Sequence, residues 1–169
     1  MAYTTLQIRP LERGDIAAVT AWARQEGFAP GSGDVAIYRH TDRQGIWVGW
    51  LGHERVGCIT GVRYTAAYGF LGLYLVQPQW RGRGYGLQIW RHALEHLADL
   101  PCIGLEAAPD RVADYAGWGF APASPTTRWQ AIGDGAIPPV IVSILSSSCV
   151  RCRTTAAVNT GKLLTPLNT

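Results

Sequence analysis

The chain alternates between two hydrophobic periods, and each change of period marks the boundary of a predicted element. Short runs with apolar, β-branched and aromatic residues predict strands, whereas apolar residues three or four apart predict helices. The predicted strands cover 5–9, 45–51, 56–64, 69–76, 102–107 and about 127–131, and 139–145 is a candidate last strand. The predicted helices cover 15–27, 35–39, 84–100 and about 110–115.

The order of these elements predicts a mixed sheet. The helix over 84–100 connects two strands, and a crossover of this kind makes the two strands parallel. The segment 52–55 is short enough for a hairpin turn, which makes the strands on either side of it antiparallel. We therefore expect an α/β (α+β) chain with a mixed, mostly antiparallel central sheet.

A glycine-rich turn follows the strand predicted at 69–76. Pro78 ends that strand because proline has no N–H to donate to a ladder. Then come Arg81, Gly82, Arg83, Gly84, Tyr85 and Gly86, directly before the apolar stripe of a helix. Unpaired N–H groups at a helix start, with the positive end of the helix dipole behind them, form an anion site. The turn therefore predicts binding of a phosphate or pyrophosphate.

Three nucleotide motifs are alternatives for this turn. A Walker loop requires Gly-Lys followed by Ser or Thr, and a Rossmann loop requires Gly-x-Gly-x-x-Gly; neither spacing is present. The third pattern, Arg81-x-x-Gly84-x-Gly86 after Val76-x-Pro78-x-Trp80, resembles motif A of the GNAT superfamily of acyl-CoA N-acyltransferases. The resemblance extends over 6–129.

The resemblance implies the GNAT fold, with helices on both faces of the sheet and the fourth and fifth strands splayed apart. It implies acetyl-CoA as cosubstrate and no metal. The pantetheine arm is expected beside Leu75 and Val76, and the pyrophosphate on the amides of Arg81, Gly82, Arg83, Gly84, Tyr85 and Gly86.

Two residues are candidates for proton transfer. Tyr115 stands before Gly119-Phe120 with the family's Tyr-x-x-x-Gly-Phe spacing, and by resemblance its hydroxyl is the general acid for the CoA thiolate. Glu106, on the predicted fifth strand, is the candidate base, although a Glu in such a run commonly faces solvent. Where the family often has an Asn, this chain has Ala108.

The acceptor is expected to be a primary amine, either a small molecule or the amino terminus of a peptide, that attacks the thioester directly. By resemblance, Glu26, Phe28 and Asp34 lie in the connection that borders the acceptor site, and Tyr64 is a candidate lining residue. Glu26 is also explained as a solvated helix end, Asp34 as a helix cap, and Tyr64 as a strand aromatic.

Composition narrows the alternatives. A length of 169 residues with 47% hydrophobic and 16% charged residues is typical of one globular domain. We expect the domain at 1–136 and a divergent tail at 137–169 that contributes a last strand at most and is a candidate for covering a sheet edge or forming a homodimer. The net charge of +3 and the absence of a basic block argue against nucleic acid as a partner.

No apolar run of membrane-spanning length is present, so we expect no membrane partner and a cytoplasmic enzyme. The cysteines at 58 and 102 are expected to be buried packing residues, whereas Cys149 and Cys152 form a lone C-x-x-C that is open to pairing, metal binding or chance. The leading function is an acetyl-CoA-dependent acyltransferase acting on an amine. The alternative is a CoA-binding or regulatory module without catalysis.

Overall fold

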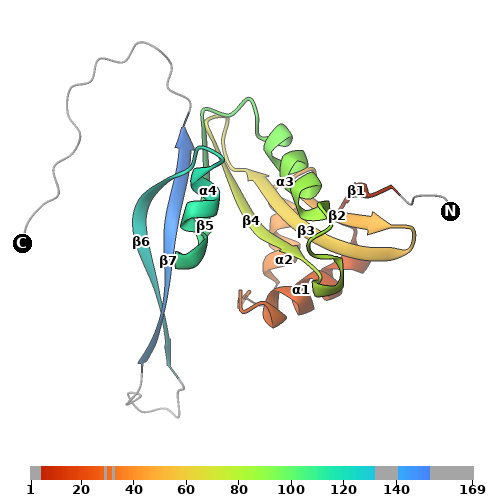
Figure 1. The fold of residues 1–169 in the computed structure, drawn as a ribbon, viewed down its shortest axis with the longest axis horizontal. Helices are drawn as coiled ribbons and strands as arrows, with labels where there is room; N and C mark the ends of the chain where they lie inside the picture. Colours follow the sequence, from red (N-terminus) through yellow and green to blue (C-terminus); the bar gives the residue numbers. More distant parts are fainter. Residues whose placement is uncertain (1–4, 29, 32, 132–140, 153–169) are drawn as a thin grey trace, which may run out of the picture.

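The computed structural model describes residues 5–28, 30–31, 33–131 and 141–152. Within them, seven strands form one sheet in the order β1-β2-β3-β4-β5-β7-β6 (Figure 1). The strands are β1 Gln7–Pro10, β2 Ile46–Leu51, β3 Glu54–Arg63, β4 Tyr68–Val76, β5 Cys102–Ala107, β6 Ala121–Ala131 and β7 Ile141–Cys152. The helices are α1 Ile16–Gln25, α2 Asp34–Thr41, α3 Tyr85–His96 and α4 Val112–Ala116.

The sheet has the predicted mixed character. β4 and β5 are parallel, and every other neighbouring pair in the sheet is antiparallel. The parallel pair arises because α3 carries the chain back across the sheet between them. This arrangement confirms the predicted fold class.

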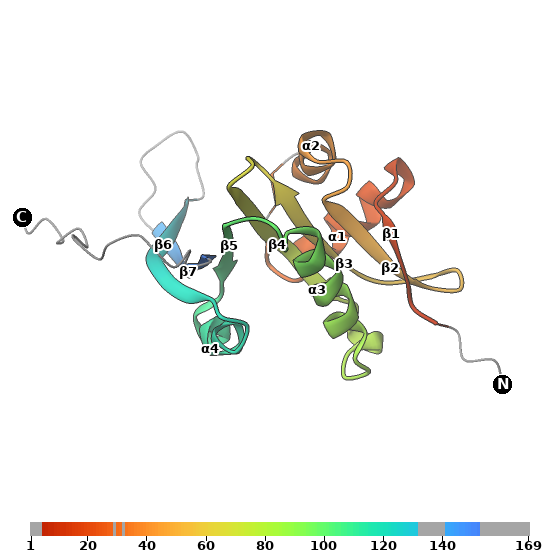
Figure 2. The same ribbon diagram turned by 90° about the horizontal axis from the view of Figure 1, so that it is seen from above.

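Helices cover the two faces of the sheet with separate cores. On one face, Val19 and Ala23 of α1 and Val35 of α2 pack against β2, β3 and the far end of β4. On the other face, α3 buries Ile89 and Ala93 against the centre of the sheet. Figure 2 shows α2 and α3 on opposite sides, with α4 on the same side as α3.

The last strand is longer at its C-terminal end than the sequence predicts. Pairing of β7 continues to Cys152, so residues 146–152, which we assigned to the tail, lie in the sheet between β5 and β6. Polar residues such as Ser147 and Ser148 obscure the strand pattern, which explains the shorter prediction. Residues 153–169 of the predicted tail lie outside the described residues.

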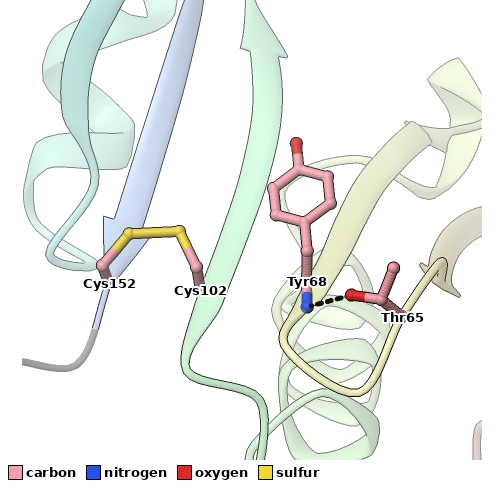
Figure 3. Close-up of a disulfide and its surroundings, with 4 residues drawn as sticks. All are labelled: Thr65, Tyr68, Cys102 and Cys152. Carbon is pink, nitrogen blue, oxygen red and sulfur yellow. Dashed lines mark hydrogen bonds between the residues drawn. A yellow bond between two sulfur atoms is a disulfide. The ribbon is translucent and has the colours of Figure 1, made fainter.

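One of the cysteines, Cys102, differs from the expectation. Cys102 and Cys152 stand opposite each other in the β5–β7 ladder and form a disulfide (Figure 3), so the assignment of Cys102 as a packing residue is wrong. Cys149 is three residues from Cys152, and side chains of a strand alternate, so the two point to opposite faces. Cys149 and Cys58 are both buried, and neither forms a disulfide within the described residues.

None of the helices in the described ranges is long and apolar enough to cross a membrane. Disulfides persist mainly in oxidising compartments, so the Cys102–Cys152 bond favours such an environment over the expected cytoplasm. The cytoplasmic location therefore stays a prediction.

Candidate functional site

A cleft of about 700 Å³ opens where β4 and β5 separate. The two strands pair only from Tyr68 opposite Cys102 to Leu71 opposite Leu105, whereas β4 continues to Val76. Figure 1 shows β4 leaning away from β5 along this stretch. The backbone of 72–76 on that edge therefore borders the cleft without a strand partner from β5, and it can pair with an extended ligand.

The glycine-rich turn forms one end of the cleft. Gly82 and Gly84 have φ values of +73° and +79°, a left-handed conformation that favours glycine, and Gly84 is the N-cap of α3. A Cβ at either position would meet no atom within 4 Å, so the backbone faces open space. The amide of Gln88 begins the ladder of the helix, bonding to Gly84 O at 3.3 Å. The preceding N–H groups point out of the helix start and create an anion site.

Gly86 serves the packing of the helix. A Cβ at Gly86 would lie 2.7 Å from the hydroxyl of Tyr74 and 3.1 Å from a methyl group of Val76. Its lack of a side chain therefore lets the first turn of α3 approach β4.

The two arginines of the turn are held in place. Arg81 donates from Nε to the carbonyl of Val76 at 2.8 Å and from Nη2 to the Glu26 carboxylate at 2.5 Å. The guanidinium of Arg83 lies 5.2 Å from the ring centroid of Trp80, which is a cation–π distance. The Glu26 carboxylate offsets the charge of Arg81, whereas Arg83, next to the N-cap of α3, adds positive charge that reinforces the attraction for an anion.

A β-bulge in β4 changes which side chains face the cleft. Two residues, Leu73 and Tyr74, stand opposite Ile59 alone, and Leu73 has a φ of +44°, which is rare for a residue with a side chain. Before the bulge, Leu71 packs on the α3 side; after it, Leu73 and Leu75 pack on the α1 side. Tyr74 is thereby turned toward α3 and the cleft.

Four aromatic side chains form the wall beneath the turn. Trp90 of α3 lies 5.3 Å from the ring of Tyr74, 5.4 Å from that of Tyr115 and 5.9 Å from that of Trp118, centroid to centroid. Burial is the main cause that raises the pKa of Tyr115 and of Tyr74. Both hydroxyls therefore remain protonated at neutral pH and can donate a hydrogen bond or a proton.

Glu106 of β5 lines the same cleft as Arg81. The Ser148 hydroxyl donates to Glu106 Oε1 at 2.5 Å, and that of Thr126 at 3.3 Å. Glu106 lines the cleft and is exposed, as the sequence suggested for a Glu in this run. It can attract a cation or accept a proton there.

The remaining candidate residues divide into two groups. Glu26 and Phe28 line the cleft together with Leu75, Val76, Arg81, Gly82, Gly84 and Gly86. Asp34 is not among the lining residues described; its carboxylate accepts the N–H of Gly31 at 2.7 Å, next to the start of α2. Tyr64 is also outside the lining and stacks on Tyr68 with ring centroids 6.4 Å apart.

Sequence reasoning did not select Trp90, Trp118, Ser148 or Thr126. Trp90 belongs to the apolar stripe of a helix and therefore indicates a core position. Ser148 and Thr126 reach Glu106 only through the long-range register of β5, β7 and β6, for which the local sequence holds no signal. Among the described residues, no group of three His, Cys, Asp or Glu side chains is placed to hold a metal ion.

Comparisons with known proteins match this architecture. The model of the Acetyltransferase (GNAT) family matches residues 16–120. Holothin acyltransferase from Pseudoalteromonas sp. (strain SANK 73390) is 32% identical over 130 residues, which is 77% of this chain and 44% of that protein. The chain thus spans less than half the length of this relative.

Solved structures also share the fold, and two of them illustrate the match at low identity. Ard1 from Thermoplasma volcanium has a TM-score of 0.70 at 17% identity, and the match covers 87% of this chain and 97% of the Ard1 chain. Arabidopsis thaliana Naa50, in complex with the bisubstrate analogue CoA-Ac-MVNAL, has a TM-score of 0.63 at 14% identity. The match covers 88% of this chain and 99% of the Naa50 chain.

Proposed function

The chain belongs to the GNAT family of acetyltransferases, and from this premise we propose that it transfers the acetyl group of acetyl-CoA to a primary amine by direct attack. The observation that carries the proposal is the cleft between the separating strands, which is lined by the N-terminus of α3 with its glycine turn and by the carboxylate of Glu106. A polyanionic thioester fits the helix N-terminus, and a cationic amine fits Glu106.

Acetyl-CoA fits the residues at the turn. Open space beside Gly82 and Gly84 admits a pyrophosphate to the backbone amides, and the charge of Arg83 adds attraction for it, while Glu26 offsets the charge of Arg81. The edge of β4 at 72–76, which includes Leu75 and Val76 and is not paired with β5, offers backbone groups to the amides of the pantetheine arm, and the carbonyl of Val76 also accepts from Arg81 Nε. When bound, acetyl-CoA supplies the activated acetyl group.

The reaction requires two proton transfers. A bond forms between the amine nitrogen and the acetyl carbon while the carbon–sulfur bond breaks, and the sulfur leaves with the electron pair. Glu106 accepts a proton from the amine, directly or through water, and Tyr115 gives its hydroxyl proton to the thiolate. The raised pKa of Tyr115 keeps that proton in place until the thiolate forms. No covalent bond to the enzyme is required.

One experiment separates catalysis from binding alone. Isothermal titration with acetyl-CoA measures affinity, and release of free thiol in the presence of a panel of primary amines measures transfer. We expect saturable binding and amine-dependent thiol release, with N-acetylated product identified by mass spectrometry. Absence of binding would refute the proposed site.

Binding without turnover on any amine would favour the alternative, a CoA-binding or regulatory module. The observation behind this alternative is Ala108, which lines the cleft with a methyl group where the family often has an asparagine.

A further inference from the structure

On the face of the sheet that carries α1 and α2, the core under these helices does not extend to β5. This part of the face lies next to the cleft. The side chains of Ile103, Leu105 and Ala107 pack into the core on the α3 side. Since side chains alternate along a strand, Gly104 and Glu106 face the opposite side. Glu106 therefore marks the point where the cleft reaches this second face.

Aromatic side chains cross β5 at Gly104. A Cβ at Gly104 would overlap the Tyr68 hydroxyl and lie 3.2 Å from the ring of Phe70. Only a glycine therefore allows these two rings to lie over the neighbouring strand. Figure 3 shows Tyr68 beside β5, its ring pointing along the strand, with the disulfide on the other side of the strand.

Tyr64 extends this surface. Its ring is stacked on that of Tyr68 at an interplanar angle of 26°, and the side chain is 49% exposed. The turn between β3 and β4 is fixed by the Thr65 hydroxyl, which accepts the N–H of Tyr68 at 3.0 Å (Figure 3). Tyr64, Tyr68 and Phe70 thus form an ordered strip, which we call the aromatic strip.

The aromatic strip leads to the carboxylate. Phe70 pairs with Gly104, so Glu106 is the next residue of β5 on the same face. Burial, then Tyr64, then Glu106 raise the pKa of Tyr68, which is consistent with a carboxylate close to that hydroxyl. One surface therefore joins flat aromatic rings to a negative charge at the mouth of the cleft.

We propose that the aromatic strip binds the ring of the acceptor, so that the enzyme prefers primary amines carrying an aromatic group on a short arm. The ammonium group lies at Glu106, where the charges are complementary, and the ring lies against Tyr68 and Phe70. This inference rests on the proposed function, because it requires the acceptor to enter the cleft at Glu106. Ring stacking provides attraction beyond burial of apolar area, which favours an aromatic over a saturated ring.

A pair of matched amines tests the preference. 2-Phenylethylamine and 2-cyclohexylethylamine have the same carbon skeleton and differ only in the aromaticity of the ring. We expect kcat/KM to be about 2- to 10-fold higher for the phenyl compound, the range of one aromatic pair. In Tyr64→Leu combined with Tyr68→Leu, which keeps only Phe70 of the strip, the ratio should fall toward one. The matched control, Tyr64→Phe with Tyr68→Phe, keeps both rings and should keep the preference.

The outcomes are distinguishable. Equal kcat/KM for the two amines in the parent, or an unchanged preference in the leucine variant, overturns the inference while leaving acetyl transfer intact. Failure of every amine to release thiol refutes the proposed function, and the inference falls with it. Analytical sedimentation of the parent and the variants tests whether a second copy of the chain occupies the strip instead. If the parent is a dimer and the leucine variant is not, the strip is an interface between copies, and the inference is overturned. Acetyl-CoA affinity, unchanged in all variants, shows that they fold.

Discussion

Gly84 provides the sharpest test of the anion site, because the effect of adding a methyl group can be worked out from the structure. Its φ of +79° lies in the left-handed region, and a Cβ there would meet no atom within 4 Å. Gly84→Ala therefore causes no steric overlap inside the protein. Its destabilisation is that of placing an L-residue at positive φ, about 1–2 kcal/mol in the free energy of unfolding.

The matched control is Gly52→Ala in the turn between β2 and β3. Gly52 also has a positive φ, +60°, and is not among the residues that line the cleft. The two variants should therefore lose similar stability, also about 1–2 kcal/mol. Chemical denaturation of both measures that common effect.

The variants should differ in cofactor binding. If the pyrophosphate binds at this turn as proposed, the methyl group of Gly84→Ala projects into the space that it needs, and the hydrogen bonds it receives from the first amides of α3 lengthen or break. A hydrogen bond to a charged group contributes about 1.5–3 kcal/mol, so loss of one weakens acetyl-CoA binding by roughly tenfold or more. Gly52→Ala should bind acetyl-CoA like the parent.

Isothermal titration of the parent, Gly84→Ala and Gly52→Ala with acetyl-CoA measures the three affinities. Parent-like affinity in Gly84→Ala would refute the assignment of the pyrophosphate to this turn. An equal loss in both variants would show that lower stability, and not the lost approach of the backbone, explains the effect.

Three further predictions concern other parts of the chain. Tyr115→Phe keeps the ring against Trp90 and should lower the single-turnover rate by about 10²-fold, the low end for a general acid, with acetyl-CoA affinity unchanged; parent-like chemistry would exclude the acid role. Since burial raises the pKa of Tyr115, the ratio of parent to Phe-variant rates should stay constant as pH rises from 7 to about 9.5 and fall only above the ordinary tyrosine value near 10; a decline beginning near pH 8 would contradict this. The Cys102–Cys152 bond closes a separation of 50 residues, so Cys102→Ser with Cys152→Ser should lower the free energy of unfolding by about 2–4 kcal/mol, and reductant should destabilise the parent but not the variant; an unchanged denaturation midpoint would contradict the bond.

The sequence by itself determined the features that depend on near neighbours in the chain. The order of strands and helices, the parallel crossover through α3 and the glycine turn at its start all follow from periodicity, proline and glycine within a few residues. For the same reason the spacing of Arg81, Gly84 and Gly86 was sufficient to indicate the family. Local backbone preference and binary patterning act over this range, so they can be read from the sequence.

The tertiary structure alone decided the features that depend on register. The bulge at Leu73 turns Tyr74 toward the cleft, and the pairing of β7 with β5 brings Ser148 to Glu106 and Cys152 to Cys102. These contacts join residues up to 50 positions apart. Because a shift of one residue in pairing reverses every side chain of a strand, only the assembled sheet determines which of them meet.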